Sequence, residues 1–314
     1  MEVTVIRPGM LTTLQDRGRP GSRAQGVPLG GAADPWALRV ANLLVGNPEG
    51  AVALECTLIG PELEFSADVT VAIGGAEFAG APRWRPMRVR AGQRLALGAA
   101  KTGCRGYLAI AGGFDVPEVL GGRGTYLRAA LGGQDGRALR EGDRLRVKGG
   151  GGVEAAGWSI DERILPAYGP EVTVRVVRGA QADELNSGFW DSGFKVSAKS
   201  DRMGVRLTGP AVTRTKAREL RSSVVAPGTI QVPPDGQPIV LLADAQTVGG
   251  YPQAAHVVTV DLPLVAQLRP GDTVRFREIR LEEAHALLRA QERRLGLLRE
   301  GLAQKFSAAR TAKP

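Results

Sequence analysis

Hydrophobic and polar residues alternate along most of this chain, in short segments that glycine and proline separate. Alternation with a period of two is typical of strands that bury one face, and glycine and proline mark the turns between them. The clearest segments are residues 3–9, 68–75, 87–97, 106–113, 143–150, 171–179 and 272–280. The pattern therefore predicts a mainly β protein.

Two segments show helical spacing instead. Residues 34–46 carry an apolar stripe, with Asp34 placed to cap the start of a helix and Gly46 to end it. From about Leu281 to Gln304, leucines recur near helical spacing among glutamates and arginines, which predicts a C-terminal amphipathic helix. The basic residues that follow are expected to fray.

A repeated phrase suggests how the chain is organised. AGQRLALG at 91–98, EGDRLRVKG at 141–149 and PGDTVRFRE at 270–278 each place a turn before an alternating strand. We expect a first β domain at 1–150, a glycine-rich linker at 151–170, a second β domain at 171–280, and a C-terminal helix and basic tail at 281–314. The alternative is that such phrases recur in any β protein.

Composition narrows the range of partners. The chain has 314 residues and a net charge of +9, but its arginines are scattered and no aromatic residues interleave with them, which argues against nucleic-acid binding. An arginine-rich surface or an acidic partner protein explains the charge equally well. Cys56 and Cys104 lack zinc or disulfide spacing, and no apolar run is long enough to cross a membrane, so we expect a cytoplasmic protein without a metal site.

Most standard catalytic patterns are missing. The only histidines are His256 and His285, and for each a structural or surface role is favoured over a catalytic one. There is no GxxxxGK[ST] sequence, so a P-loop nucleotide site is excluded.

Three polar clusters remain as candidate sites. The first, residues 12–21, places Asp16 and Arg19 in a loop limited by glycine and proline, and the second, 199–207, places Asp201 and Arg202 similarly. Arginine can bind a carboxylate or phosphate through two nitrogens, although for each cluster taken singly an arginine–aspartate pair that holds a loop to the core is the favoured interpretation. The third cluster follows an apolar run and consists of Asp244, Gln246, Thr247 and Tyr251.

These clusters are parts of a family pattern. Residues 12–21, GVPLGGAADPWALRVANLLVGN at 26–47, LECTLIGPELEF at 54–65, the segment 107–126, SDRMGVRL and the segment 228–252 together resemble the family of the 5-oxoprolinase C subunit. That family is also described as biotin-dependent carboxyltransferase-like or as allophanate hydrolase subunit 2, and it includes the KipA proteins. The resemblance implies tandem cyclophilin-like β-barrel domains.

The resemblance also implies a reaction and partners. Family members act with a KipI-like protein (the 5-oxoprolinase B subunit) and a LamB/YcsF-like protein (the A subunit), and together these open the lactam of 5-oxoproline to glutamate with ATP and water. ATP is therefore expected at the level of the complex. Bound biotin is not expected, because the chain has no AMKM biotin-acceptor sequence.

For this chemistry, cations, neutral donors and a carboxylate are needed. We expect Arg19 and Arg202 to contact anionic groups, and Tyr251 to stack on or hydrogen-bond the ring. The expected orienting donors are Gln231, Gln237, Gln246 and Thr247, and the carboxylate candidates are Asp16, Asp34, Asp201 and Asp244.

Two alternatives remain open. One is a carboxyltransferase module of the urea amidolyase type, with biotin carried on another protein. The other is a non-catalytic protein that binds a KipI-like partner and regulates a sensor kinase. The chain also departs from the family at 121–125, where GGRGT replaces the usual GSRST and removes two hydroxyl donors.

Overall fold

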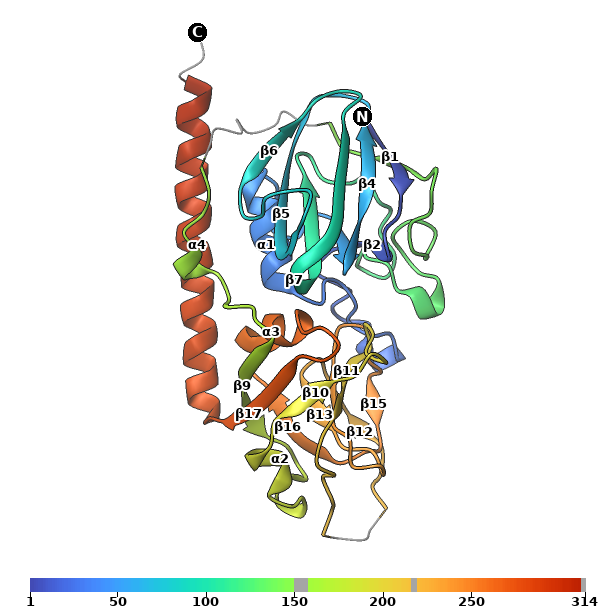
Figure 1. Cartoon of the computed structure of the whole chain (residues 1–314), viewed down its shortest axis with the longest axis vertical. Helices are drawn as coiled ribbons and strands as arrows, with labels where there is room; N and C mark the ends of the chain where they lie inside the picture. The colour runs from blue at the N-terminus through green and yellow to red at the C-terminus, as the bar shows by residue number, and fades with distance from the viewer. Residues whose placement is uncertain (150–157, 216–218, 312–314) are drawn as a thin grey trace.

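The computed structural model describes residues 1–149, 158–215 and 219–311. Two β units are stacked along the long axis, and one long helix, α4 (Leu281–Thr311), runs beside both of them (Figure 1). The predicted mainly β fold and the C-terminal helix are confirmed. The first part of the linker expected at 151–170, residues 151–157, lies outside the described residues. Beyond that point, Trp158 and Ile160 already pack against the core of the first unit.

The first unit is an eight-stranded sheet. Its path of neighbouring strands is β2-β3-β7-β4-β1-β8, and β5 pairs with β6 and β7. The strands are β1 (Glu2–Arg7), β2 (Leu11–Gln15), β3 (Ala53–Thr57), β4 (Ile59–Phe65), β5 (Val69–Phe78), β6 (Pro86–Val89), β7 (Arg94–Ile110) and β8 (Arg144–Arg146).

The sequence segment 87–97 is not one strand. A turn closed by the hydrogen bond from Gln93 N to Arg90 O separates β6 from β7, and Gly92 takes a positive φ of 72° there. Strand β7 then continues without a break through the segment 106–110, which the sequence pattern had separated from it. Alternation alone could not join these two halves, because β7 is exposed along its first part and buried along its last.

The second unit closes into a barrel in the order β10-β11-β14-β13-β16-β9-β17. Strands β9 and β17 pair in parallel, and the other neighbours are antiparallel. The barrel strands are β9 (Glu171–Arg178), β10 (Phe194–Val196), β11 (Gly204–Thr208), β13 (Thr229–Gln231), β14 (Ile239–Leu241), β16 (Gln253–Val257) and β17 (Thr273–Glu278). A separate two-stranded ribbon is formed by β12 (Ser223–Val224) and β15 (Val248–Gly249).

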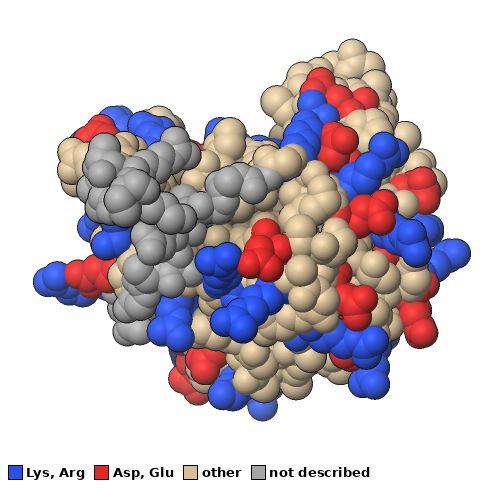
Figure 2. All heavy atoms as spheres, turned by 90° about the horizontal axis from the view of Figure 1, so that it is seen from above, with Lys and Arg blue, Asp and Glu red and all other residues tan. Residues whose placement is uncertain are grey.

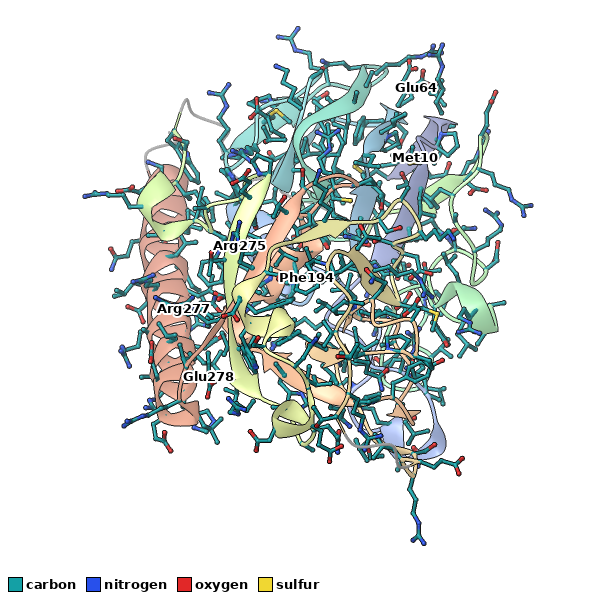
Figure 3. The ribbon with its side chains drawn as sticks, turned by 60° about the horizontal axis from the view of Figure 1, so that its bottom comes forward. Met10, Glu64, Phe194, Arg275, Arg277 and Glu278 are labelled. Atoms are coloured by element: carbon teal, nitrogen blue, oxygen red, sulfur yellow. The ribbon has the colours of Figure 1, made fainter. Side chains whose placement is uncertain are left out.

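The barrel interior is aromatic at one end. Phe194 is fully buried and lies 6.0 Å from the ring of Phe276, while Arg277 and Glu278 at the end of β17 are exposed (Figure 3). Inward and outward residues thus alternate along β17, as the sequence pattern predicts for a half-buried strand.

Helix α1 (Pro35–Leu44) packs on the first sheet, and its predicted cap is confirmed, because the Asp34 side chain accepts a hydrogen bond from Ala37 N. Short helices α2 (Gly188–Asp191) and α3 (Leu262–Ala266) belong to the second unit. Helix α4 buries Leu295 and Leu302 in the first core, and the exposed Glu292 on α4 binds Arg39 of α1 through two oxygens at 2.5 and 2.7 Å.

The surface mixes charges of both signs. On the face in Figure 2, Lys and Arg are interspersed with Asp and Glu and do not gather into one continuous stripe. Among the described residues, no helix is both long and apolar enough to span a membrane.

Candidate functional site

A buried ion-pair network joins the two β units, and we call it the seam network. Arg202, just before β11, donates from Nε to Asp244 Oδ2 at 2.8 Å and from Nη2 to Asp244 Oδ1 at 3.0 Å. Its Nη1 pairs with Glu55 of β3 in the first unit, and Nη2 also donates to Gly31 O at 2.6 Å. The five N–H donors of a guanidinium lie in one plane and point in different directions within it. Arg202 can therefore bind Asp244 with one edge of this plane and groups of the first unit with the rest. Arg202 is therefore held between the two units.

Burial and charge oppose each other in the seam network. Burial alone would raise the pKa of Glu55, but the guanidiniums of Arg202 and Arg105 outweigh it and hold that pKa below its ordinary value. Burial would likewise lower the pKa of Arg202, and the carboxylates of Glu55 and Asp244 raise it instead. Each partner thus stays charged because the other is present.

The hydrogen bonds continue from Glu55 to Asp34. Glu55 Oε2 accepts from Tyr107 OH at 2.7 Å, and that hydroxyl accepts from Asp34 N at 2.8 Å. The Asp34 carboxylate accepts from Ala37 N, from Tyr168 OH at 2.7 Å and from Gln267 Nε2 of the second unit at 2.8 Å. Burial raises the pKa of Asp34 to about 6 in spite of these hydrogen bonds.

Arg19 lies next to the seam network and is fully buried. It donates from Nε to Val119 O at 3.1 Å and from Nη2 to Gly124 O, while Nη1 has no hydrogen-bond partner among the described residues. A Cβ added to Gly30 would lie 3.3 Å from Arg19 Nη1 and 3.9 Å from Asp244 Oδ1, so these two groups flank Gly30. Burial lowers the pKa of Arg19.

Asp16 is also occupied by the backbone. Its Oδ1 accepts from Gly18 N at 2.8 Å, and its Oδ2 accepts from Arg123 N at 2.6 Å. The first bond closes a turn within the loop after β2, and the second ties that loop to the loop that carries GGRGT. The structure thus gathers Arg19, Arg202 and Asp244 in one buried region, with Asp16 and Asp34 at its edges.

The remaining predicted residues lie elsewhere, on the outside of the barrel. A hollow of about 690 Å³ opens there, and we call it the outer hollow. Five of the residues predicted from the sequence are among those that line it, namely Asp201, Gln231, Gln237, Gln246 and Tyr251. Its walls also carry two cations that the sequence reasoning had not assigned a role, Lys199 and Arg206.

Strand geometry explains why these side chains face outward. Val205, Ile230 and Val240 point into the barrel core, so the residues adjacent to them along each strand point away from it. Three of these adjacent residues, Arg206, Ile239 and Gln231, are paired directly across β11, β14 and β13. Side chains of directly paired residues share one face of a sheet. A single row across three strands therefore forms part of the hollow.

The three glutamines of the outer hollow differ in how exposed they are and in whether their amide groups are already hydrogen-bonded. Gln246 is exposed and donates from Nε2 to Gln231 Oε1 at 3.2 Å, whereas Gln231 is buried and its Nε2 has no partner among the described residues. Gln237 also lines the hollow, but its amide already binds both N and O of Gly209. Thr247 is buried and does not line it. Gln246 is thus the most available of the predicted donors.

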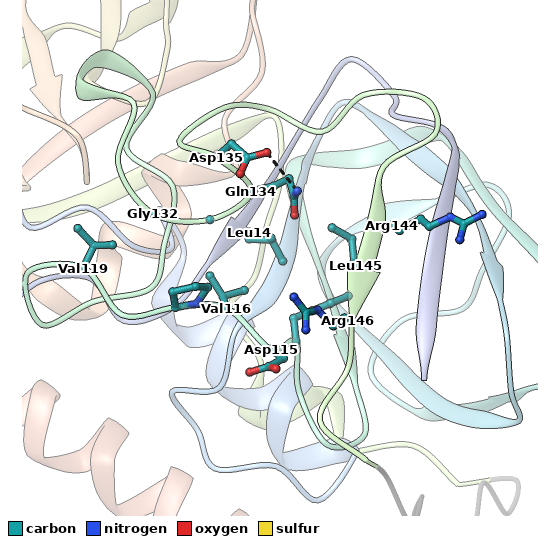
Figure 4. Close-up of a pocket in the computed structure, with 13 residues that line it drawn as sticks. Leu14, Asp115, Val116, Val119, Gly132, Gln134, Asp135, Arg144, Leu145 and Arg146 are labelled. Atoms are coloured by element: carbon teal, nitrogen blue, oxygen red, sulfur yellow. Dashed lines mark hydrogen bonds between the residues drawn. The ribbon is translucent and has the colours of Figure 1, made fainter.

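Two further cavities offer less chemistry. One of about 360 Å³ lies on the first unit, where Gln134 and Asp135 are hydrogen-bonded to each other (Figure 4). Three of its charged residues are paired at the rim, in the pairs Asp135–Arg137, Asp115–Lys148 and Arg144–Glu2. The other, of about 350 Å³, lies between the units and is mainly apolar. Three of the predicted site residues, Asp201, Arg202 and Asp244, stand in its wall, but the last two are already paired with each other.

Metal and histidine chemistry find little support. In the described part of the chain, no group of three His, Cys, Asp or Glu side chains is arranged to hold a metal ion. His256 is a half-buried residue of β16 whose Nδ1 lies 3.2 Å from Thr229 Oγ1, and burial lowers its pKa. His285 is exposed on α4.

Known proteins resemble this chain over most of its length. A family model described as the carboxyltransferase domain, subdomain A and B, matches residues 25–278. The chain is 43% identical to the C subunit of 5-oxoprolinase from Escherichia coli, over 92% of this chain and 95% of that protein. It is 36% identical to the C subunit of 5-oxoprolinase from Haemophilus influenzae, over 93% of this chain and 96% of that protein.

This chain belongs to the carboxyltransferase-domain family that includes the C subunit of 5-oxoprolinase.

The resemblance stated from the sequence is thereby confirmed. A crystal structure of Kluyveromyces lactis urea amidolyase matches with a TM-score of 0.88 at 30% identity, over 95% of this chain. Only 20% of that much longer protein is covered. The carboxyltransferase-domain match begins at residue 25, so it contains the seam network and the outer hollow but not Asp16 or Arg19.

Some residues of both sites escaped the sequence reasoning. Glu55 was one, although a single carboxylate within the apolar run VALECTL is a signal of a buried partner, since an unpaired buried charge is costly. Tyr107 and Gln267 gave no comparable signal. Lys199 and Arg206 stood in a recognised cluster, but only the structure shows that both line the hollow while Arg202 faces the seam. For Arg206 the strand register explains this orientation.

Proposed function

We propose that this chain is one subunit of an ATP-dependent complex that hydrolyses 5-oxoproline to glutamate. The end-to-end match to the C subunits of two 5-oxoprolinases carries the proposal, because it covers nearly the whole of both chains in each pair. The match to urea amidolyase covers only a fifth of that protein. A whole-chain correspondence is what a separate subunit of a complex requires.

The partners in this proposal are a KipI-like protein and a LamB/YcsF-like protein in the cytoplasm. ATP is bound by the complex, and this chain supplies no P-loop for it. A lactam resists attack by water. Transfer of the γ-phosphoryl group of ATP to the carbonyl oxygen, with release of ADP, would activate the carbonyl carbon. Water then adds at that carbon, and the ring C–N bond breaks as the nitrogen takes up a proton, which leaves an acyl phosphate. A second water molecule hydrolyses the acyl phosphate to glutamate and phosphate. Positioning and charge stabilisation are the protein's contribution to such steps.

The outer hollow is the place on this chain that suits the lactam. Gln246 offers an exposed amide oxygen to the ring N–H, and Tyr251 offers an exposed aromatic face to the ring. Of the four candidate carboxylates, Asp201 is the exposed one, and we assign proton transfer to it. The seam network, whose arginine is fully engaged, acts in this proposal by fixing the two units relative to each other.

Carboxyl transfer is the second candidate. The TM-score of 0.88 to urea amidolyase favours it, since the same backbone serves in that protein. In this case a biotin carried on another protein would deliver the carboxyl group, and a urea-like amide would occupy the hollow.

The test is glutamate release from 5-oxoproline by the three co-purified proteins, each omitted in turn. We expect release that needs ATP and all three proteins. An assembled and soluble complex that releases none would refute the proposed function. The same preparation, given carboxybiotin and urea, would then show carboxyl transfer if the second candidate is right.

A further inference from the structure

The outer hollow contains two cations for which neither the seam network nor the lactam contacts account. Lys199 and Arg206 are both exposed in its wall. Arg206 has a backbone hydrogen bond from its N to Ser200 Oγ at 3.0 Å, and Lys199 N likewise donates to Ser197 Oγ. Neither side chain takes part in an ion pair within the described ranges. Both charged heads therefore face water.

Two acids share the hollow, and each is already engaged by main-chain N–H groups. Asp201 Oδ1 accepts from Met203 N at 2.8 Å and from Gly204 N at 3.2 Å. Asp235 Oδ1 accepts from Gln237 N at 3.0 Å. These bonds hold the carboxylates on their own turns, which is the usual behaviour of aspartate in loops. The acids thus leave the cations available to an external anion.

The spacing between the Arg206 guanidinium and the side-chain amides of Gln231 and Gln246 suits a small ring that carries a carboxylate. Arg206 and Gln231 share one row and are separated by a single strand, so their backbones are about 10 Å apart. The two side chains extend from opposite ends of that row, with the Gln246 amide hydrogen-bonded to Gln231. Ile239, between them, provides an apolar floor. A five-membered ring with an amide on one side and a carboxylate on the other would bridge this gap.

We propose that Arg206, with Lys199 beside it, binds the carboxylate of a cyclic-amide acid whose lactam lies against Gln246, which the buried Gln231 holds in place. This proposal rests on the proposed function, because it places the substrate of the complex in the outer hollow. It adds a basis for specificity: a neutral amide such as urea or an unsubstituted lactam has no group for the two cations. Discrimination then depends on the carboxylate, which a charge-assisted hydrogen bond recognises strongly.

The experiment uses the assembled complex and compares Arg206→Gln and Lys199→Gln with Lys195→Gln. Lys195 is an exposed lysine of the neighbouring strand β10 that does not line the hollow. We expect Arg206→Gln to raise KM for 5-oxoproline about tenfold or more, since a hydrogen bond to a charged group is lost in ground state and transition state alike. We expect a smaller rise for Lys199→Gln and no change for Lys195→Gln.

Pyrrolidin-2-one, the same ring without the carboxylate, serves as the probe of pocket integrity. Its inhibition constant should be the same for wild type and Arg206→Gln. A KM for Arg206→Gln within about twofold of wild type would overturn the inference, and so would an equal loss of pyrrolidin-2-one binding. If the complex releases no glutamate, the proposed function fails separately. Calorimetric titration of the full chain with 5-oxoproline then decides the inference, which requires binding that Arg206→Gln weakens.

Discussion

Removal of the Arg202 side-chain charge is the sharpest test of how the two β units are held together. Arg202→Met keeps most of the length of the side chain but leaves two carboxylates at the seam without their shared counter-ion. The side chains of Arg202, Glu55 and Asp244 are only 5%, 1% and 5% exposed. Breaking a buried ion pair from one side costs about 3–5 kcal/mol, because the remaining charge stays buried.

The free energy of unfolding, from urea denaturation followed by circular dichroism, measures this cost. The matched control is Arg94→Met, because Arg94 pairs with Glu64 at 3.0 Å but the two side chains are 58% and 39% exposed. Such a pair contributes about 0–1 kcal/mol. A loss for Arg202→Met that is no larger than the control loss would refute the reasoning.

A second variant separates burial of unpaired charge from loss of packing. In Arg202→Met combined with Glu55→Gln and Asp244→Asn, the two carboxylates that Arg202 neutralises are removed with it, so part of the stability should return. The buried Arg105 and Arg19 nearby keep their charges, so the recovery should be incomplete. The comparison also affects how activity data are interpreted. Loss of activity in an Arg202 variant places this residue in function only if its unfolding free energy is measured on the same preparation.

Three further predictions concern other parts of the molecule. Burial raises the pKa of Asp34 from 3.8 to about 6, so the folded state binds this proton more tightly than the unfolded state does. The contribution of this group to stability therefore falls as the pH rises between these two values. Asp34→Asn should reduce the change of the urea midpoint with pH over this range, and an unchanged pH dependence would contradict the assignment. Leu295→Ala should lower the unfolding free energy by about 2–5 kcal/mol, because Leu295 is 1% exposed, whereas Leu297→Ala, at a position 69% exposed on the same helix, should change it by less than about 0.5 kcal/mol. Gly132→Ala should lower the melting temperature more than Gly142→Ala does. Both glycines have a positive φ, but only at position 132 would an added Cβ lie 2.3 Å from Arg19 Nη2. Equal drops in melting temperature would argue against this close approach.

Local features of the fold could be predicted from the sequence, but the long-range strand pairing that closes the second unit into a barrel could not. The cap at Asp34 and the leucine spacing after residue 281 depend on neighbours within a few residues, so α1 and α4 were identified correctly. Joining 94–110 into one strand required knowledge of the pairing of β7 with β3, β4 and β5. Closure of the second unit likewise depends on the parallel pairing of β9 with β17, about a hundred residues apart along the chain.

The candidate site shows the same limit for charged residues. Arg202 and Arg206 stand four positions apart in one cluster, and of the two only Arg202 was predicted to contact an anion. Their roles differ because Arg202 meets Glu55, a residue 147 positions away, whereas no carboxylate of another strand reaches Arg206 in the described structure. Which arginine is free is therefore decided by long-range pairing that composition and spacing do not encode.

This difference determines where an anion can bind. An anion at Arg202 would have to displace Glu55 or Asp244 from a buried ion pair, and the displaced carboxylate would be left without a partner. An anion at Arg206 would displace no carboxylate of the described residues, since the acids that share the hollow accept hydrogen bonds from backbone N–H groups. Anion recognition by this chain is therefore expected on the outer face of the second unit. The seam network is one of the contacts that hold this face against the first unit, together with the Gln267–Asp34 hydrogen bond.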